Sequence, residues 1–433
     1  MKRKHLIIYF FACITFVIFH TSCSQVESDS WDTETKPSVS QDTIAEYTMG
    51  DLEIVAKVLD EQGYDTSEIM SRIKEDSSQT KLIAAAVINS EKVITTIVNP
   101  ANPSKMLKVS GVLLYPKNHY FKSNLKLVVA TPGTYTDNQL APSNFFSNLW
   151  TWQNNLIGNS GGIAITPYLL NAAENPILLI DYPGFGASYG QIAHPYLDQK
   201  VLATSSISLI RKAQNILENR RVRLCTKEIM VTGYSQGAFS ATSIVREIET
   251  NPANKDLKVS SLLVGGIPAY LSKILDLAIE KNTVDVSYFF PYALTGYKKV
   301  RYPNLNLGAI VREPYYTQML NDFRGNGVEY NYPNSMQMIY KDHFLQNYKT
   351  SNDFALLRYI LSSNDIKPWK NSAKFYIYHG MADVTVDYSQ AKEFAIDQNK
   401  NGGKVLFIPM PFLNHIAGFV PYWIAASSKM NEN

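Results

Sequence analysis

The sequence predicts an α/β fold, with a mostly parallel central sheet, helices on both faces and a helical cap insertion. Short, almost wholly apolar segments alternate with helical stretches, a pattern typical of strands buried in a parallel sheet. One such segment, Glu228–Thr232, leads directly into a Gly-x-Ser-x-Gly pentapeptide that opens a helical pattern. About a hundred residues then separate Gly266 from Lys374, where a minimal fold of this kind needs only one helix. We expect this stretch, about 267–373, to form the cap.

The composition is that of a globular protein with a large core. The 433 residues are 45% apolar and 18% charged, which excludes a disordered or coiled-coil chain. This length suits one α/β core with insertions. A net charge of +3, with no basic stripe beyond the first residues, gives no support for nucleic-acid binding.

The first 22 residues are expected to be a lipoprotein-type signal peptide. Lys2-Arg3-Lys4-His5 is a basic region, and Leu6–Phe19 is an apolar stretch too short to span a membrane comfortably. Thr21-Ser22 precede Cys23, as in the lipobox of bacterial lipoproteins, although His20 replaces the usual apolar residue. We expect lipidation of Cys23 and anchoring to a bacterial outer membrane or cell surface. Release to the periplasm or medium, or a retained anchor, are the alternatives.

The cysteine count agrees with export without disulfides. Cys13 would leave with the signal peptide and Cys23 would carry the lipid, so Cys225 would remain alone. Residues 23–43, rich in Ser, Thr, Asp and Glu, are expected to form a disordered tether. Residues 44–81 are expected to be helical, because Ile44, Tyr47 and the apolar residues after them fall near one helical face.

Residues 82–433 are expected to form the α/β domain. Ala84–Asn89, Val93–Val98 and Val109–Tyr115 predict an antiparallel meander. The buried, mostly parallel strands are expected at Leu125–Ala130, Ile177–Asp181, Glu228–Thr232, Leu262–Gly265, Phe375–His379 and Val405–Pro409. Sheets of this kind carry their sites at the carboxyl ends of the strands. The loops that follow these strands are therefore the places to look for a site.

Ser235 is the predicted nucleophile. A serine in Gly-x-Ser-x-Gly between a strand and a helix lies on a sharp turn that holds its hydroxyl clear of the backbone. Gly233 and Gly237 flank it where a Cβ would crowd that turn. The helix is expected to begin at Gln236 and to stop at Asn251-Pro252. A chance match of the pentapeptide is the alternative, which the strand and helix on either side argue against.

Two backbone N–H groups are expected to stabilise a developing oxyanion. One belongs to Gln236, the residue after the nucleophile, and the other to the loop Thr131–Tyr135 after the strand Leu125–Ala130. Within that loop Thr134 is the predicted donor and Tyr135 the second choice. An ordinary Pro-Gly turn is the alternative interpretation of this loop.

The motifs together resemble a known family. From about residue 82 onward the chain looks like an α/β-hydrolase-fold serine esterase. The run Asp181–Ser188, followed by His194-Pro195-Tyr196 and Ser235, resembles the bacterial and fungal secretory lipases. Asp181–Ser188 contains no lysine and has the wrong spacing for a phosphate loop. Pro132-Gly133 departs from the His-Gly that many relatives carry before the oxyanion residue.

The resemblance implies that Asp383 and His415 complete a catalytic triad with Ser235. His379–Val386 resembles the family's HGxxDxxV acid loop, in which Asp383 is the acid, and Asp387 is the reserve candidate. His415 follows the last strand and is the only histidine after Asp383. A metal site formed by His379, Asp383 and Asp387, at intervals of four, is an alternative, but Gly380 follows a strand, which disfavours one shared helical face.

The cap is rich in tyrosine and phenylalanine, as in Tyr288–Tyr292. These rings suit a pocket for an acyl or aryl group, or they fill the cap's own core. The expected activity is that of an exported serine hydrolase that cleaves carboxylic esters through an acyl-enzyme, without metal or cofactor. Glycerolipids, acetylated glycans and aryl esters all remain candidate substrates. A serine peptidase of the same fold and a non-catalytic surface-binding lipoprotein are the alternative functions.

Overall fold

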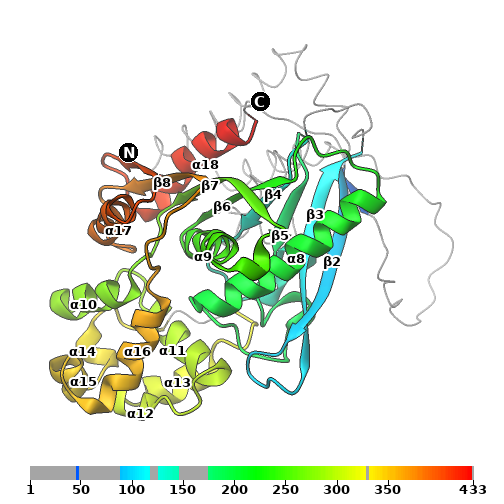
Figure 1. Ribbon diagram of the computed structural model, residues 1–433. Coiled ribbons are helices and arrows are strands. Elements are labelled where there is room, and N and C mark those ends of the chain that lie inside the picture. The colour runs from blue at the N-terminus through cyan, green and yellow to red at the C-terminus, as the bar shows by residue number, and fades with distance from the viewer. Residues whose placement is uncertain (1–44, 48–87, 118–124, 146–173, 328–330, 432–433) are drawn as a thin grey trace, which may run out of the picture.

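The computed structural model describes residues 45–47, 88–117, 125–145, 174–327 and 331–431. These residues form a nine-stranded sheet in the order β1-β2-β3-β5-β4-β6-β7-β8-β9 (Figure 1). The strands are β1 Ala45–Tyr47, β2 Ile88–Val98, β3 Met106–Pro116, β4 Val128–Thr131, β5 Ile177–Ile180, β6 Glu228–Tyr234, β7 Lys258–Gly265, β8 Lys374–Gly380 and β9 Val405–Met410.

The sheet is antiparallel at one end and parallel over the rest, which confirms the predicted fold class. β1, β2, β3 and β5 pair antiparallel in that order. From β5 through β4, β6, β7 and β8 to β9 every pairing is parallel. The carboxyl ends of the parallel strands therefore meet along one edge, where the predicted site loops follow them.

The two short strands predicted at Ala84–Asn89 and Val93–Val98 are replaced by one strand, β2, within the described residues. The polar residues between them do not break it, because Glu91 is buried and paired. Its carboxylate oxygens each accept a hydrogen bond of 3.1 Å from Arg220, and the Tyr115 hydroxyl lies 3.4 Å away. A polar group that has such partners can stay inside a sheet.

The helix expected from residue 44 is not seen over Ala45–Tyr47, which form β1. This strand pairs with Ile88, Asn89 and Ser90 of β2. Its backbone N–H and C=O groups thus pair with the edge of the sheet instead of with one another, as they would in a helix. The signal peptide, Cys23, the tether and residues 48–81 lie outside the described residues.

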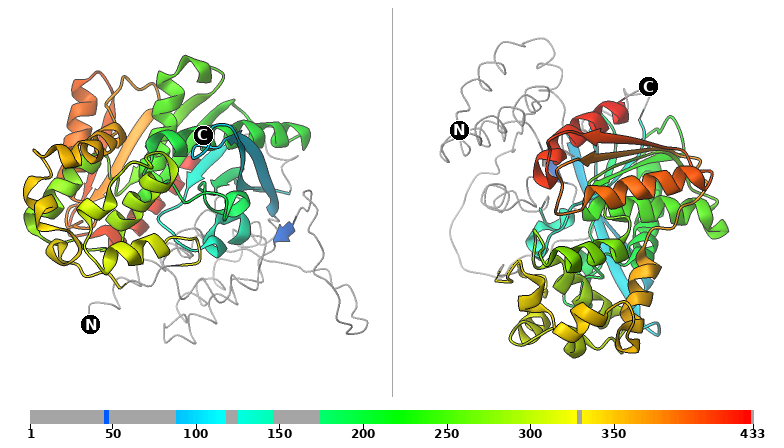
Figure 2. Two further views of the ribbon diagram at one scale, coloured as in Figure 1. Left: turned by 90° about the horizontal axis from the view of Figure 1, so that it is seen from below. Right: turned by 90° about the vertical axis from the view of Figure 1, so that its left-hand side faces the viewer.

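The helices flank the sheet and build the cap. They are α5 Pro142–Phe145, α8 Gln199–Asn219, α9 Gln236–Thr250, α10 Leu271–Lys281, α11 Phe289–Val300, α12 Leu307–Ile310, α13 Tyr315–Asn321, α14 Met336–Ile339, α15 Asp342–Asn347, α16 Ala355–Asn364, α17 Tyr388–Lys400 and α18 His415–Asn431. α8 and α9 cover one face of the sheet and α18 lies on the other (Figure 2). In the described ranges no helix combines the length and apolar character needed to cross a bilayer.

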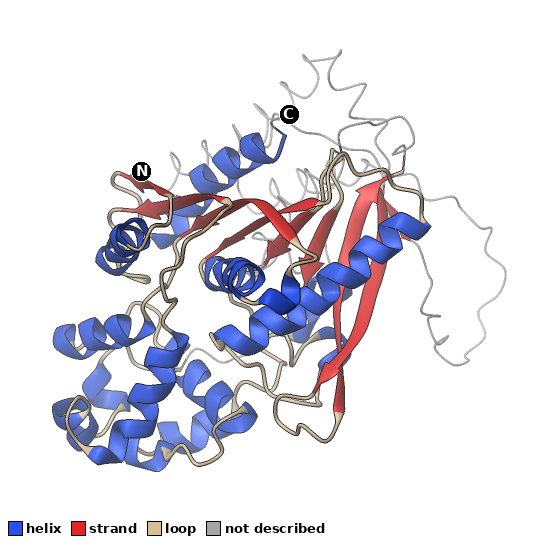
Figure 3. Ribbon diagram, in the orientation of Figure 1, coloured by secondary structure: helices blue, strands red, loops and turns tan. Residues whose placement is uncertain are grey.

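The predicted cap is helical. Helices α10 to α16 all lie between β7 and β8 in the chain and gather beyond the edge of the sheet (Figure 3). Several of its aromatic residues fill its own core: Phe323 stacks on Tyr292 with ring centroids 4.6 Å apart, and Tyr340 and Phe344 are fully buried. Others, such as Phe289 and Phe290 on α11, line a pocket next to Ser235. The cap aromatics are thus divided between the core of the cap and the wall of this pocket.

Candidate active site

Ser235 lies on a strained turn between β6 and α9. Its φ of 58° and ψ of −121° belong to a region that a residue with a side chain rarely adopts. The flanking glycines allow the chain to turn so tightly. A Cβ on Gly237 would lie 2.1 Å from the Thr131 carbonyl oxygen, and one on Gly233 would lie 2.4 Å from the Gly237 carbonyl carbon. The hydroxyl is thus presented at the amino end of α9, whose dipole favours negative charge.

His415, the first residue of α18, reaches Ser235, the predicted nucleophile. Its Nε2 lies 2.9 Å from the Ser235 Oγ. Two contacts fix the residue. The Tyr234 hydroxyl donates to its carbonyl oxygen at 2.6 Å, and Gly266 packs so closely against its ring that an added Cβ would lie 2.9 Å from Cε1. The imidazole is therefore held in position to take the serine proton.

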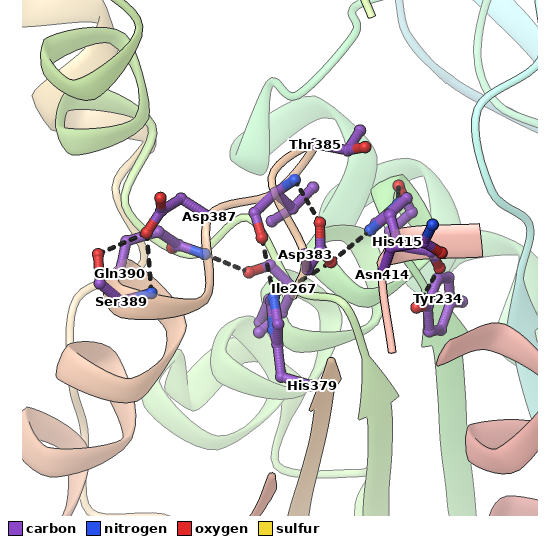
Figure 4. Close-up of polar contacts among 12 residues, drawn as sticks. Tyr234, Ile267, His379, Asp383, Thr385, Asp387, Ser389, Gln390, Asn414 and His415 are labelled. Carbon is purple, nitrogen blue, oxygen red and sulfur yellow. Dashed lines mark hydrogen bonds and ion pairs between the residues drawn. The ribbon is translucent and has the colours of Figure 1, made fainter. Parts of the chain in front are cut away.

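Asp383 holds the other side of the imidazole. Its Oδ2 lies 2.7 Å from His415 Nδ1, while its Oδ1 accepts a 2.8 Å bond from the Val386 N–H (Figure 4). His379 Nε2 lies 3.3 Å from the same Oδ2. Burial alone would raise the pKa of Asp383, but hydrogen bonds with His379 and His415 outweigh it and lower the pKa to about 2. The carboxylate is therefore ionised at neutral pH and can stabilise a protonated His415.

Asp387, the reserve acid, lies elsewhere. It caps α17 by accepting a 2.9 Å hydrogen bond from the Ser389 N–H, and it pairs with Lys281 at 2.8 Å. Figure 4 shows it directed toward Ser389 and away from His415. Asp387 therefore does not gather with His379 and Asp383, and the described part of the chain contains no group of three or more His, Cys, Asp or Glu placed to share an ion.

The predicted oxyanion residues come from two segments that meet at the Ser235 turn. Gln236 begins α9, so its N–H is one of the groups at a helix start that lack an intrahelical acceptor. The loop after β4 lies against the turn, with the Thr131 Oγ1 2.7 Å from the Gly237 carbonyl oxygen. In this loop the Thr134 hydroxyl contacts the Tyr196 hydroxyl at 3.0 Å. The Tyr135 side chain is buried in the core, where its hydroxyl accepts a bond from the Tyr182 N–H.

The structure adds His379, His194 and Tyr196 to the vicinity of the site. His379 Nε2 lies 2.9 Å from the Val386 carbonyl oxygen and 3.3 Å from Asp383 Oδ2, whereas His194 and Tyr196 contact the side chains of Gln236 and Thr134. The sequence contained a signal for each, because His379 belongs to the acid-loop motif and the other two to His194-Pro195-Tyr196. What the sequence did not give was the contact that each residue makes.

An apolar pocket opens beside Ser235 and Gln236. It runs between cap helices α10 and α11 and has a cavity volume of about 140 Å³. Its walls include Leu271, Leu275 and Ala278 of α10 and Phe289, Phe290 and Ala293 of α11. Such walls suit a hydrocarbon group attached to a reacting carbonyl.

Known structures share this architecture. A provisionally assigned hydrolase from Legionella pneumophila is 17% identical with a TM-score of 0.66, covering 83% of this chain and 94% of its own. The rice cell wall degrading esterase LipA from Xanthomonas oryzae is 18% identical with a TM-score of 0.63, covering 80% and 89%. Candida antarctica lipase A is 14% identical with a TM-score of 0.55, covering 76% and 73%. No family model and no curated protein sequence matches the chain.

These neighbours confirm the resemblance to esterases and lipases at the level of the fold. The chain has the α/β-hydrolase fold, with β6, the Ser235 turn and α9 in the arrangement that the fold uses for its nucleophile. A shared fold does not by itself fix the reaction, which has to be argued from the site.

Proposed function

We propose that this protein is a serine hydrolase that cleaves carboxylic esters through an acyl-enzyme. The observation that carries the proposal is the continuous hydrogen-bonded chain from Ser235 Oγ through His415 to Asp383, at 2.9 and 2.7 Å, next to an apolar pocket. A nucleophile, a base and a carboxylate in this order are the minimum for acyl transfer by serine.

In the proposed mechanism Ser235 Oγ attacks the ester carbonyl while His415 Nε2 takes its proton. The oxygen of the tetrahedral intermediate faces the Gln236 N–H and a second N–H of the loop after β4, for which Thr134 is the candidate. His415 then gives the proton to the departing alkoxide, which leaves Ser235 acylated. Water, activated by the same imidazole, releases the acid and restores the enzyme. Asp383 stays ionised throughout and stabilises the imidazolium.

The pocket between α10 and α11 supports an ester whose acyl chain is longer than acetyl. Each methylene that leaves water for such a wall contributes about 0.8 kcal/mol. The sequence also supports export and anchoring through a lipid on Cys23, with the domain acting at a bacterial envelope. A lipid-anchored esterase would meet its substrates outside the cytoplasm.

Labelling with a fluorophosphonate probe tests the proposal. Wild type should label, whereas Ser235→Ala should not label and should lose about 10⁶-fold in kcat on p-nitrophenyl butyrate. Ser243→Ala is a matched control on the same helix, because its hydroxyl only donates to the Phe239 carbonyl at 2.7 Å. A folded wild type that neither labels nor hydrolyses esters would support the non-catalytic alternative. Ester hydrolysis by a folded Ser235→Ala variant would remove Ser235 from the mechanism.

A further inference from the structure

We infer that His194 and Tyr196 are positioning residues that set the two sides of the oxyanion site, and that they link this site to the cap. The inference rests on the proposed function, since it concerns the groups that would bind the oxyanion. His194-Pro195-Tyr196, called here the 194–196 segment, touches the side chains of both predicted oxyanion residues. His194 contacts Gln236, and Tyr196 contacts Thr134.

The contact between His194 and Gln236 has one consistent set of donors and acceptors. His194 Nδ1 lies 2.9 Å from the Pro183 carbonyl, which can only accept, so Nδ1 carries the proton. Burial lowers the pKa of His194 to about 3, so the ring is neutral and Nε2 is an acceptor. The Gln236 amide nitrogen, 2.7 Å from Nε2, therefore donates to it. This bond fixes the side chain of the residue whose backbone N–H faces the oxyanion.

The contact between Tyr196 and Thr134 holds the other side. Their hydroxyl oxygens are 3.0 Å apart, and Tyr196 is buried. Burial raises the pKa of the Tyr196 hydroxyl well above its usual range, so it remains a neutral hydrogen-bonding group. The loop after β4 is held at its two ends, by Thr131 Oγ1, 2.7 Å from the Gly237 carbonyl oxygen, and by the Tyr135 hydroxyl, which accepts a bond from the Tyr182 N–H. The Tyr196 hydroxyl supplies a fixed point at Thr134.

The 194–196 segment is itself held between the core and the cap. Two glycines pack directly against His194, leaving no room for a side chain. An added Cβ on Gly184, in the loop after β5, would lie 2.6 Å from the backbone nitrogen of His194, and one on Gly296 of α11 would lie 2.6 Å from the His194 carbonyl oxygen. The Tyr196 ring stacks on Tyr292 of α11, with centroids 4.6 Å apart and planes 14° apart. Helix α11 thus supports the same segment that contacts both oxyanion residues.

The expected consequence is an effect on turnover more than on substrate binding. Donors stabilise an oxyanion only when they lie about 2.7–3.1 Å from it, and loss of one donor costs about 10²–10³-fold in kcat. A displaced donor should cost less than a missing one. The ring of Tyr196 lines the pocket, so Tyr196→Phe keeps the pocket wall and removes only the hydroxyl.

The test compares Tyr196→Phe, Thr134→Val and the double variant on p-nitrophenyl butyrate. We expect each single variant to lose about 10-fold in kcat with KM changed less than twofold, and the double variant to lose no more than either single one. The Ki of a trifluoromethyl ketone, whose adduct with the serine carries an oxyanion, should rise about as much as kcat falls. Thr134→Ser, which keeps the hydroxyl that contacts Tyr196, should recover most of the kcat that Thr134→Val loses. Additive losses, or a change in KM alone, would overturn the role of Tyr196.

A second pair tests His194. His194→Phe fits the surrounding aromatic rings but cannot accept a hydrogen bond, and Gln236→Met removes its partner. Their losses in kcat should likewise not add. Tyr332→Phe is the control, because its hydroxyl makes a 2.8 Å bond to Asp322 within the cap and should leave kcat unchanged. Unchanged kcat in His194→Phe and Tyr196→Phe, in a protein that still labels with fluorophosphonate, overturns this inference alone. A wild type that does not label overturns the proposed function and this inference together.

Discussion

Acid should destabilise this protein through His194, and the size of the effect follows from the surroundings of its ring. The side chain is 3% exposed, and its ring neighbours include Tyr182, Phe185 and Tyr292, none of which is charged. Burial lowers its pKa from 6.5 to about 3. Between these values the unfolded chain binds a proton that the native protein does not, so the free energy of unfolding falls as the pH falls.

The expected loss approaches about 1.4 kcal/mol per pH unit well inside this window and comes to roughly 2.3 kcal/mol between pH 6.5 and 4.5, since the unfolded histidine is only half protonated at pH 6.5. Urea denaturation followed by circular dichroism at pH 7, 6, 5 and 4.5 measures it. His194→Phe removes the titrating group from both the native and the unfolded state. Between pH 6.5 and 4.5 the unfolding free energy of this variant should therefore fall less than that of wild type, and the difference should equal the loss expected for His194, whatever the stability of the variant at pH 7. Asp383, with a pKa of about 2, keeps its charge over this range. Parallel curves for wild type, His194→Phe and His194→Gln would refute the reasoning.

Three further predictions concern the acid, the substrate and the anchor. Asp383→Asn should favour the wrong tautomer of His415 and cost about 10⁴-fold in kcat, whereas Asp387→Asn should cost less than about tenfold; the reverse ranking would reassign the acid. Across p-nitrophenyl esters from acetate to palmitate, with Ser235→Ala as the blank, kcat/KM should rise about fourfold per added methylene up to butyrate or beyond, and a maximum at acetate would argue against an acyl pocket. Cys23→Ala should release the protein from the membrane fraction or leave an unprocessed precursor, and a mature N-terminus that begins at another residue would end the lipoprotein hypothesis.

Local chemistry made the strand, turn and helix around Ser235, and the sheet itself, predictable from the sequence. The Ser235 turn needs glycine on both sides, a strand before it and a helix after it, and all of these features lie within a few residues of one another. Parallel strands that are buried on both faces are also visible in the sequence as apolar runs, because helices cover both faces of the sheet and successive side chains are all buried. Asp383 and His415 are distant in sequence, and their choice rested on the order and position that the family resemblance implied. The structure places His415 within hydrogen-bond distance of both Ser235 and Asp383.

Features that depend on partners distant in the chain could not be predicted from the sequence. The polar middle of β2 indicated a break, because nothing local reveals that Arg220, far along the chain, pairs with Glu91. A strand at Ala45–Tyr47 depends on the exposed edge of β2 rather than on its own side-chain pattern. His194 and Tyr196 stood out as a motif, yet their contacts to Gln236 and Thr134 arise only when the loops after two different strands converge.

The cap contacts the loops of the proposed active site from two directions. On the oxyanion side, α11 supports Tyr196 through the stack with Tyr292. On the acid side, Lys281 at the end of α10 pairs with Asp387 at 2.8 Å, and the Thr385 hydroxyl donates to Asp285. Both acid-side contacts fall on the loop that carries Asp383, between the acid and α17. The pocket walls also come from α10 and α11. A substitution in these helices that alters the pocket therefore also affects the helices that contact Tyr196 and Asp387. Substrate preference and turnover are therefore expected to vary together when the cap is altered, unlike in a site where specificity and chemistry lie on independent elements.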